Sequence, residues 1–274
     1  IFSDILVIPH ALGQDVRFVE GKGPVLDALA DNSAVSALAT KLDQERASPV
    51  YEALTRVRAQ LPETTALIGF AGAPWTLATY MVEGGSSRDF ARVKEWAYND
   101  AVGFGALMDK LVSAVTAHLI AQIDAGAEAV QIFDSWAGVL DEVMFQKWCI
   151  NPIARIVAGV KSAHPSVPVI GFPNRCGALY QAFVGGTGVD AVSIDAAVPM
   201  DWAREHLQSH VCVQENLDPI ALKSGGAAMK EAATRILSGL GQGPHVFNLG
   251  HGVIPSTPPD HVAELVALVR SSAT

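Results

Sequence analysis

Acidic, phenolic, hydroxyl and imidazole side chains follow or interrupt short apolar segments of this sequence, and they are its best candidates for chemistry. Asp4 lies within an apolar run, where an ionised carboxylate is costly unless it is paired or hydrogen-bonded. His251 stands between two glycines after another run, so its backbone and imidazole could approach a ligand closely. Tyr80 and Ser135 follow two further runs. These positions form a set rich in hydrogen-bonding groups, as a binding site for a polar ligand requires.

Each of these four residues also has a structural interpretation, which the residues alone leave open. Asp4 could pair with a base or with backbone amides, and His251 could be a structural histidine. Tyr80 could fill the core from a short helix, and Ser135 could cap the helix that follows it. Several other reactions lack their motifs, because the sequence has no HExxH, no GxxxxGK[ST] and no GxSxG.

The three cysteines indicate neither a zinc site nor a disulfide framework. Cys149, Cys176 and Cys212 form no CxxC motif and cannot all pair with one another, which favours a reducing, cytoplasmic setting. His210 and Cys212 have the spacing of metal ligands, but no third ligand follows at a recognisable distance. We therefore expect no bound metal.

The candidate residues need elements that bring them together, and seven short apolar segments predict strands. They are residues 1–8, 66–72, 129–136, 167–174, 189–195, 210–216 and 245–252. Their β-branched and aromatic residues show no clean alternation, as is typical of parallel strands buried on both faces. Helical patterns lie between most of them, at residues 49–60, 104–125, 140–163 and 258–270.

Strands that alternate with helices predict an α/β fold with a parallel sheet. We favour a (β/α)8 TIM barrel, in which side chains at the carboxyl ends of the strands meet at one face. The alternative is an open doubly wound sheet, but no GxGxxG fingerprint follows any strand. The chain starts with Ile rather than Met, so we expect a further strand before residue 1. Residues 15–26 predict a hairpin, residues 83–100 predict a flexible stretch and a helix, and residues 1–274 predict a single domain.

The composition excludes several classes of protein. Half of the 274 residues are apolar and 17% are charged, which allows a large core and excludes a disordered chain. No window approaches the roughly 18 uninterrupted apolar residues of a membrane span, so we expect no membrane association. The net charge of −9 and the lack of a Lys/Arg-rich run argue against a nucleic-acid partner.

Several long segments resemble the uroporphyrinogen decarboxylase family in its bacterial form. The motifs are IFSDILVIPHALG at 1–13, GFAGAPWTLATYMVEGGSS at 69–87, QIFDSWAG at 131–138, NLDP at 216–219 and NLGHGVIP at 248–255. The resemblance implies a single (β/α)8 barrel that forms a homodimer and works without metal or organic cofactor. It also implies conversion of uroporphyrinogen III to coproporphyrinogen III, with loss of four acetate carboxyls as CO2, in haem and chlorophyll biosynthesis.

The resemblance also implies roles for individual residues. The aspartate of the family's FSDIL motif falls on Asp4, where it accepts hydrogen bonds from the pyrrole N–H groups, and the tyrosine beside it falls on Tyr80. A fixed carboxylate in a water-poor pocket would stabilise the cation that forms when a pyrrole carbon is protonated. The implied substrate contacts are Phe70, Phe133, Ser135 and His251, of which the two phenylalanines line the cleft.

The sequence also departs from the family pattern. The family's arginine-rich motif, which binds substrate carboxylates, is absent from residues 1–274, and we expect it upstream of residue 1. Residues 1–274 alone should therefore lack activity and be prone to aggregate. Glu215 replaces a family glycine, and PNRCGA at 173–178 differs from the family's usual PRGAGL. We expect the positive charge of Arg175, in the second segment, to offset the negative charge of Glu215.

Two other functions on the same fold remain as alternatives. One is a cobalamin-dependent methyltransferase that holds zinc through His-x-Cys and a later Cys. Cys176 lies near that motif, but Asn174 stands where the His should be, and His251 lies near the place of the later Cys. The other alternative is a catalytically inactive barrel that acts as a binding or dimerisation module.

Overall fold

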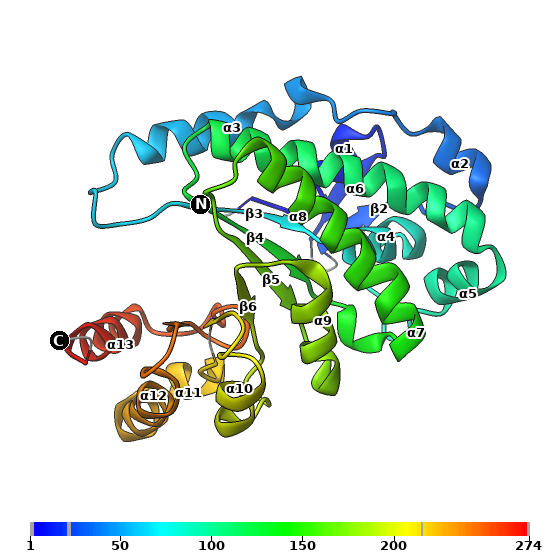
Figure 1. Cartoon of the computed structure of the whole chain (residues 1–274). Coiled ribbons are helices and arrows are strands. Elements are labelled where there is room, and N and C mark those ends of the chain that lie inside the picture. Colours follow the sequence, from blue (N-terminus) through cyan, green and yellow to red (C-terminus); the bar gives the residue numbers. More distant parts are fainter. Residues whose placement is uncertain (1–2, 21–22, 215, 273–274) are drawn as a thin grey trace.

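The computed structural model describes residues 3–20, 23–214 and 216–272. They form an α/β fold around a parallel sheet of six strands, whose order in space is their order in the chain (Figure 1). These strands are β3 (Ile68–Gly72), β4 (Ala129–Asp134), β5 (Val169–Pro173), β6 (Ala191–Ser193), β7 (Cys212–Gln214) and β8 (His245–Val246). Six of the seven predicted strands are therefore confirmed.

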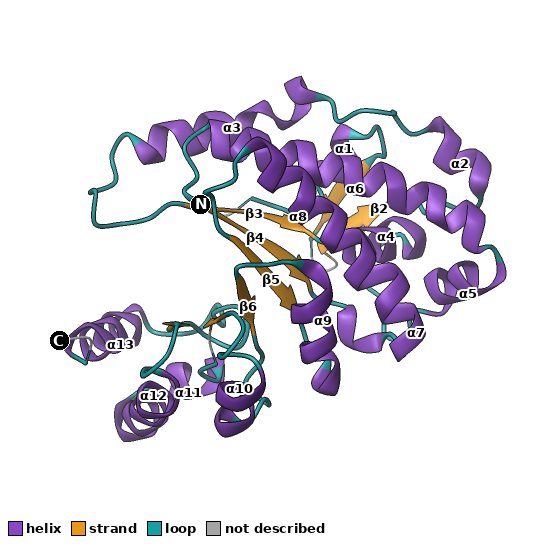
Figure 2. Cartoon of the chain, viewed as in Figure 1, coloured by secondary structure: helices purple, strands orange, loops and turns teal. Residues whose placement is uncertain are grey.

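At least one helix lies between every two neighbouring strands of the sheet. The helices up to the fourth strand are α1 (Val7–Ala11), α2 (Asn32–Ala37), α3 (Gln44–Arg58), α4 (Pro74–Glu83), α5 (Ala91–Asn99) and α6 (Ala101–Asp124). The later ones are α7 (Glu142–Phe145), α8 (Asn151–Ala163), α9 (Tyr180–Thr187), α10 (Met200–His206), α11 (Pro219–Ser224), α12 (Gly226–Leu240) and α13 (Pro259–Ser271). The long helices α6 and α8 lie side by side on one face of the sheet (Figure 2).

The predicted first strand, residues 1–8, is wrong, and Asp4 does not lie in a strand. The Oδ1 atom of Asp4 accepts a hydrogen bond from the backbone N–H of Leu6 at 2.8 Å, and the N–H of Val7 donates to the Asp4 carbonyl at 3.2 Å. These local bonds turn the chain into α1. An aspartate that bonds to nearby backbone groups competes with strand formation in this way. Residues 1 and 2 lie outside the described ranges.

The other local predictions hold, with shifted boundaries. The predicted hairpin is confirmed as β1 (Val16–Val19) paired antiparallel with β2 (Gly23–Leu26). Helix α3 begins before the predicted residue 49, because the side chain of Asp43 caps the helix by accepting from two backbone N–H groups. A π-helical turn (Gln146–Ile150) joins α7 to α8 within the helical segment predicted at residues 140–163.

The two faces of the sheet have different partners. A Cβ atom added to Gly69 would collide with Gln122 of α6, so alternate residues such as Phe70 point to the opposite face. On that opposite face the rings of Phe70 and Phe133 meet edge to face at 5.8 Å, and those of Phe133 and Phe172 at 6.0 Å. An aromatic row thus crosses β3, β4 and β5.

Helix α6 packs within the protein core. It has the length and apolar composition to cross a membrane, and it is the one such helix in the described residues, but half of its apolar window is buried inside the fold. Its contacts with α4, α8 and β3 account for this burial.

The histidine of α6 makes the stability of the protein depend on pH. His118 is buried, its Nδ1 atom lies 2.9 Å from the hydroxyl of Tyr51, and burial lowers its pKa to about 4. The unfolded chain, with an ordinary pKa near 6.5, therefore binds a proton first, and stability falls as the pH falls below 6.5. Between pH 7 and pH 5 the wild type should lose about 2 kcal/mol more than His118→Asn.

Urea unfolding at several pH values measures this difference. The exposed His10 provides a matched control, because His10→Asn removes a histidine without changing a buried group. The pH dependence of His10→Asn should follow that of the wild type. If the unfolding free energy of His118→Asn fell as steeply between pH 7 and pH 5 as that of the wild type, the lowered pKa of His118 would be contradicted.

Candidate active site

A pocket of about 480 Å³ lies at the carboxyl ends of β4 and β5, and we call it the strand-end pocket. Its described lining residues are Ser87, Arg88, Phe90, Ser135, Trp136, Gly138, Val139, Asn174, Arg175 and His251. The pocket thus brings together Ser135 and His251, which the sequence analysis selected from two distant segments. They meet because parallel strands end at the same edge of the sheet.

Backbone hydrogen bonds lock the loops that follow β4 and β5 to each other. The N–H of Asn174 donates to the carbonyl of Asp134 at 3.1 Å, and the N–H of Gly138 donates to the carbonyl of Asn174 at 3.0 Å. The side-chain amide of Asn174 donates to the carbonyl of Ser135 at 3.2 Å. A Cβ atom on Gly138 would lie 2.9 Å from the Cβ of Arg175, so only glycine allows this close approach.

A fully buried carboxylate supports the floor of the pocket. The hydroxyl of Thr76 donates to Oδ1 of Asp134 at 2.6 Å and accepts from the backbone N–H of Trp136 at 3.3 Å. Oδ2 of Asp134 has no hydrogen-bond partner at ordinary distance among the described residues. Burial raises the pKa of Asp134 to about 6, against smaller opposing effects of the Thr76 hydroxyl and the Cys149 thiol. Asp134 belongs to the QIFDSWAG segment at 131–138, and none of the predictions from the sequence gave it a role.

Tyr80 lies beside the strand-end pocket. Its ring lies on α4, 6.3 Å from the ring of Trp136, which lines the pocket. Burial raises the pKa of Tyr80, Trp136 opposes this effect, and the negative charge of Asp4 adds to it. Asp4 itself is half-buried and lines a separate hollow of about 310 Å³ with Ser3 and His10 among others.

The predicted cleft residues Phe70 and Phe133 are half-buried members of the aromatic row. They lie on β3 and β4, on the face of the sheet turned away from α6, and line none of the hollows described here. The structure therefore places Ser135 and His251 in one pocket, Tyr80 beside Trp136 of that pocket, Asp4 in a separate hollow, and the two phenylalanines on the sheet.

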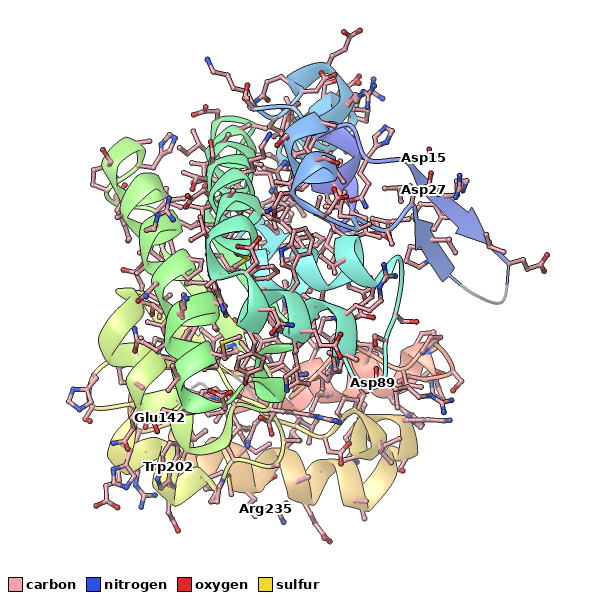
Figure 3. The ribbon with its side chains drawn as sticks, turned by 90° about the vertical axis from the view of Figure 1, so that its right-hand side faces the viewer. Asp15, Asp27, Asp89, Glu142, Trp202 and Arg235 are labelled. Atoms are coloured by element: carbon pink, nitrogen blue, oxygen red, sulfur yellow. The ribbon has the colours of Figure 1, made fainter. Side chains whose placement is uncertain are left out.

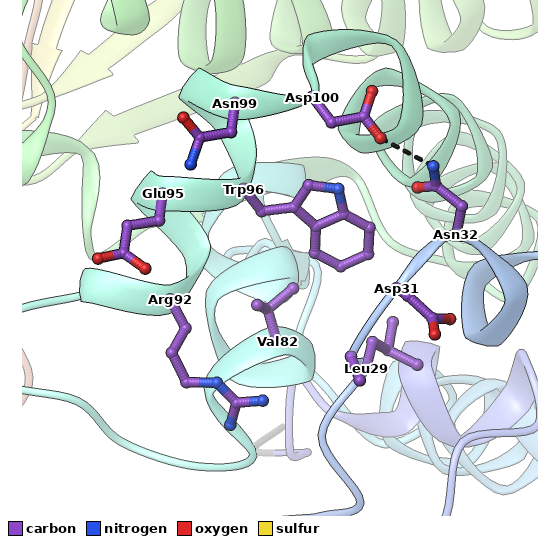
Figure 4. Close-up of a pocket in the computed structure, with 10 residues that line it drawn as sticks. Leu29, Asp31, Asn32, Val82, Arg92, Glu95, Trp96, Asn99 and Asp100 are labelled. Carbon is purple, nitrogen blue, oxygen red and sulfur yellow. Dashed lines mark hydrogen bonds between the residues drawn. The ribbon is translucent and has the colours of Figure 1, made fainter.

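A third hollow, of about 390 Å³, contains none of the predicted site residues (Figure 4). Three of its polar side chains have structural roles. The amide of Asn32 donates to Oδ2 of Asp100 at 2.8 Å, and Asp31 and Asp100 cap the helices α2 and α6. The other polar side chains of the lining are Arg92, Glu95 and Asn99.

The residues do not fit the zinc site of the methyltransferase alternative. No three His, Cys, Asp or Glu side chains gather as a ligand set in residues 3–20, 23–214 and 216–272. Cys176 is buried, and burial together with the charge of Asp195 raises the pKa of its thiol, which disfavours the thiolate that zinc requires. Glu215, the other departure from the family pattern, lies outside the described residues.

Comparisons with known proteins identify the family. The profile of the uroporphyrinogen decarboxylase family matches residues 1–272. Uroporphyrinogen decarboxylase of Rhodospirillum rubrum is 54% identical over 271 residues, which are 99% of this chain and 78% of the relative. Those of a Chelativorans species and of Mesorhizobium japonicum are 49% and 48% identical, over 98% and 100% of this chain and 78% and 79% of theirs.

Solved structures of the same fold are more distant in sequence. A putative vitamin-B12-independent methionine synthase from Listeria monocytogenes superposes with a TM-score of 0.56 at 14% identity, over 82% of this chain and 68% of that one. A B12-independent methionine synthase from Shewanella gives 0.55 at 10% identity, over 95% and 73%. These likenesses show a shared fold only. The match to the family profile and the sequence identities near 50% show that the chain belongs to the uroporphyrinogen decarboxylase family.

Proposed function

We propose that the protein is a uroporphyrinogen decarboxylase that converts uroporphyrinogen III to coproporphyrinogen III. The observation that carries this proposal is the meeting of Ser135 and His251, from two family motifs, in one pocket beside Tyr80 of a third. Each of the four acetate side chains of the substrate would lose its carboxyl as CO2 and become a methyl group. No metal or organic cofactor takes part in this proposal.

The proposed chemistry uses the pyrrole ring itself as the electron sink. Protonation of a pyrrole ring carbon gives a cation, and the electron pair of the breaking bond between methylene and carboxyl flows into that cation. The exocyclic methylene that results takes up a proton to become a methyl group, and the ring carbon loses the proton that it gained. Asp4 would stabilise the cation and orient the pyrrole N–H groups, with Tyr80 beside it.

The remaining predicted residues would bind the substrate. Ser135 and His251 would hydrogen-bond to it from the strand-end pocket. His251 is exposed there, and its Nδ1 accepts from the backbone N–H of Gly252 at 2.8 Å, so Nε2 would be the atom that meets the substrate. Phe70 and Phe133 would contact individual pyrrole rings of the macrocycle, since aromatic side chains pack well against the face of another aromatic ring.

The surrounding architecture also belongs to this proposal. We infer a single domain over residues 1–274 that is part of a closed (β/α)8 barrel. The sequential order of β3 to β8 supports this, because a doubly wound sheet reverses its strand order. We further infer a cytoplasmic homodimer. The three cysteines, which form no disulfide in the described structure, fit a reducing compartment.

Direct assay of the reaction tests the proposed function. The protein expressed from its complete reading frame is incubated without oxygen with uroporphyrinogen III, and the products are oxidised and separated by their number of carboxyl groups. We expect the tetracarboxylate as end product, four CO2 per macrocycle, and the same rate after treatment with a chelator. Unchanged octacarboxylate would contradict the proposal.

A further inference from the structure

The strand-end pocket has a marked positive character within an acidic protein. The chain has 28 acidic and 19 basic residues, yet the described lining of the pocket contains Arg88, Arg175 and His251 and no acid. Within the described ranges neither guanidinium has an ion pair or a side-chain hydrogen bond. Two arginines that face one pocket and have no acidic partner among the described residues indicate an anionic ligand, because a guanidinium binds a carboxylate through two parallel hydrogen bonds.

A buried acceptor without a donor also points to a ligand in this pocket. Oδ1 of Asn174, a lining residue that is only 5% exposed, has no hydrogen-bond partner among the described residues. Its orientation is set, because the other end of the amide donates to the carbonyl of Ser135. A buried acceptor is costly while it lacks a donor, so this atom favours a ligand or a bound water that brings one.

The backbone holds the arginine side of the pocket in an unusual conformation. Arg175 and Phe90 have φ angles of 59° and 57°, and they are the non-glycine residues with positive φ in the described structure. Both line the strand-end pocket. Strained residues of this kind persist where surrounding contacts enforce them, and they cluster at ligand-binding sites.

Specific contacts enforce the conformation of Arg175. Its backbone N–H donates to Oδ2 of Asp195 at 3.1 Å, and that carboxylate also accepts from the Tyr180 hydroxyl at 3.0 Å and from the N–H of Ala197 at 2.9 Å. Gly138 contacts the other side of Arg175. The carboxylate of Asp195 thus accepts hydrogen bonds from two backbone N–H groups and the Tyr180 hydroxyl. Among the described residues it forms no ion pair with the Arg175 guanidinium, which can therefore bind a ligand in the pocket.

We propose that Arg175 and Arg88 bind carboxylates of the acidic side chains of the substrate. This inference rests on the proposed function, and it adds two specificity-determining residues to the site. Arg175 also lines a neighbouring hollow of about 740 Å³ with Trp202, so it stands between two spaces. A macrocycle that carries carboxylates around its rim can therefore reach this guanidinium from either side.

Steady-state kinetics of Arg175→Gln, in the protein expressed from its complete reading frame, tests the inference. Glutamine keeps the backbone N–H and much of the side-chain length, so the change isolates the charged head group. We expect KM for uroporphyrinogen III to rise about five- to twentyfold while kcat stays within about twofold, as for loss of a ground-state carboxylate contact. Partly decarboxylated intermediates should accumulate. Arg175→Lys should give an intermediate KM, and Arg88→Gln with Arg175→Gln should give a larger rise than either alone.

Arg235→Gln is the matched control for loss of one positive charge. Arg235 is exposed on α12 and lies apart from Asp89, the neighbour of Arg88, in Figure 3. Its variant should keep the wild-type KM, and thermal melting should show that all variants are folded. A wild-type KM in the double arginine variant would overturn the inference while the proposed function stands.

A binding measurement separates the inference from the proposed function. Uroporphyrin, the stable oxidised octacarboxylate, is titrated into wild type and Arg175→Gln, and its fluorescence reports binding without turnover. Arg175-dependent binding by a protein that does not decarboxylate uroporphyrinogen would overturn the proposed function alone. A wild type that neither binds uroporphyrin nor decarboxylates uroporphyrinogen would overturn both.

Discussion

Asp4→Asn, in the protein expressed from its complete reading frame, should lower kcat for uroporphyrinogen decarboxylation about a hundred- to a thousandfold. The substitution keeps the size of the side chain but removes the negative charge that would stabilise the protonated pyrrole. It also places an amide N–H2 group where the pyrrole N–H donors need an acceptor. The loss of kcat is measured as the rate of product formation at saturating uroporphyrinogen III, with the products separated by their number of carboxyl groups.

Stability should not follow activity in this variant. Asparagine retains an oxygen that can accept the hydrogen bond from the N–H of Leu6, and Asp4 is only half-buried. We therefore expect a change of within about 0.5 kcal/mol in the free energy of unfolding. Asp15→Asn, at an exposed carboxylate beside the hairpin, is the matched control and should keep the wild-type kcat. Normal turnover by Asp4→Asn together with easier unfolding would show that Asp4 has a structural role.

Asp134→Asn should make the protein progressively more stable, relative to the wild type, as the pH rises from 4 to 7. Burial raises the pKa of Asp134 in the folded state from its ordinary value of 3.8 to about 6. Above pH 3.8 the unfolded chain releases this proton first, so the carboxyl destabilises the fold increasingly until the pH exceeds about 6. The difference in unfolding free energy between variant and wild type should grow by about 2–3 kcal/mol over this range.

The quantity to measure is how the difference in unfolding free energy between Asp134→Asn and the wild type changes with pH. Any pH-independent effect of replacing the carboxylate adds a constant to that difference and does not alter its change. The wild type alone would not reveal the effect, since His118 shifts stability in the opposite direction over nearly the same range. Asp109→Asn, at an exposed carboxylate, is the control for loss of one surface acid. A pH-independent difference between Asp134→Asn and the wild type would show that Asp134 ionises normally.

The strands and the meeting of Ser135 with His251 could be predicted because they depend on local composition and on a general property of parallel sheets. Runs of β-branched and aromatic residues between helices indicate buried parallel strands, and the ends of such strands share one edge. The failure at residues 1–8 has a local cause. A single hydrogen bond from the backbone N–H of Leu6 to the carboxylate of Asp4 turns an apolar run into the start of a helix, and apolar composition does not reveal it.

The roles of Arg175 and Asp134 depend on contacts between distant segments, so the sequence could not show them. Arg175 faces the pocket because Asp195 binds its backbone and Gly138 permits a close approach, and none of these three residues neighbours another in the chain. Asp134 is fully buried beside Thr76 of α4 and Cys149 of the π-helical turn, which are distant from it in the chain. One signal was available for it, namely an aspartate directly after the apolar residues of a strand.

The acid-free strand-end pocket in a protein of net charge −9 has a consequence for the rate at which a polycarboxylate arrives. At 0.1 M salt the Debye length is about 10 Å, and beyond that distance an incoming anion is little affected by the arginines or by the net negative charge of the molecule. In dilute buffer the screening is weaker, so the anion meets the repulsion of the whole molecule first. The arginines attract it only over the last few ångströms. Moderate ionic strength therefore removes a barrier to encounter, and capture should become faster as salt is added, whereas a uniformly cationic surface would be slowed.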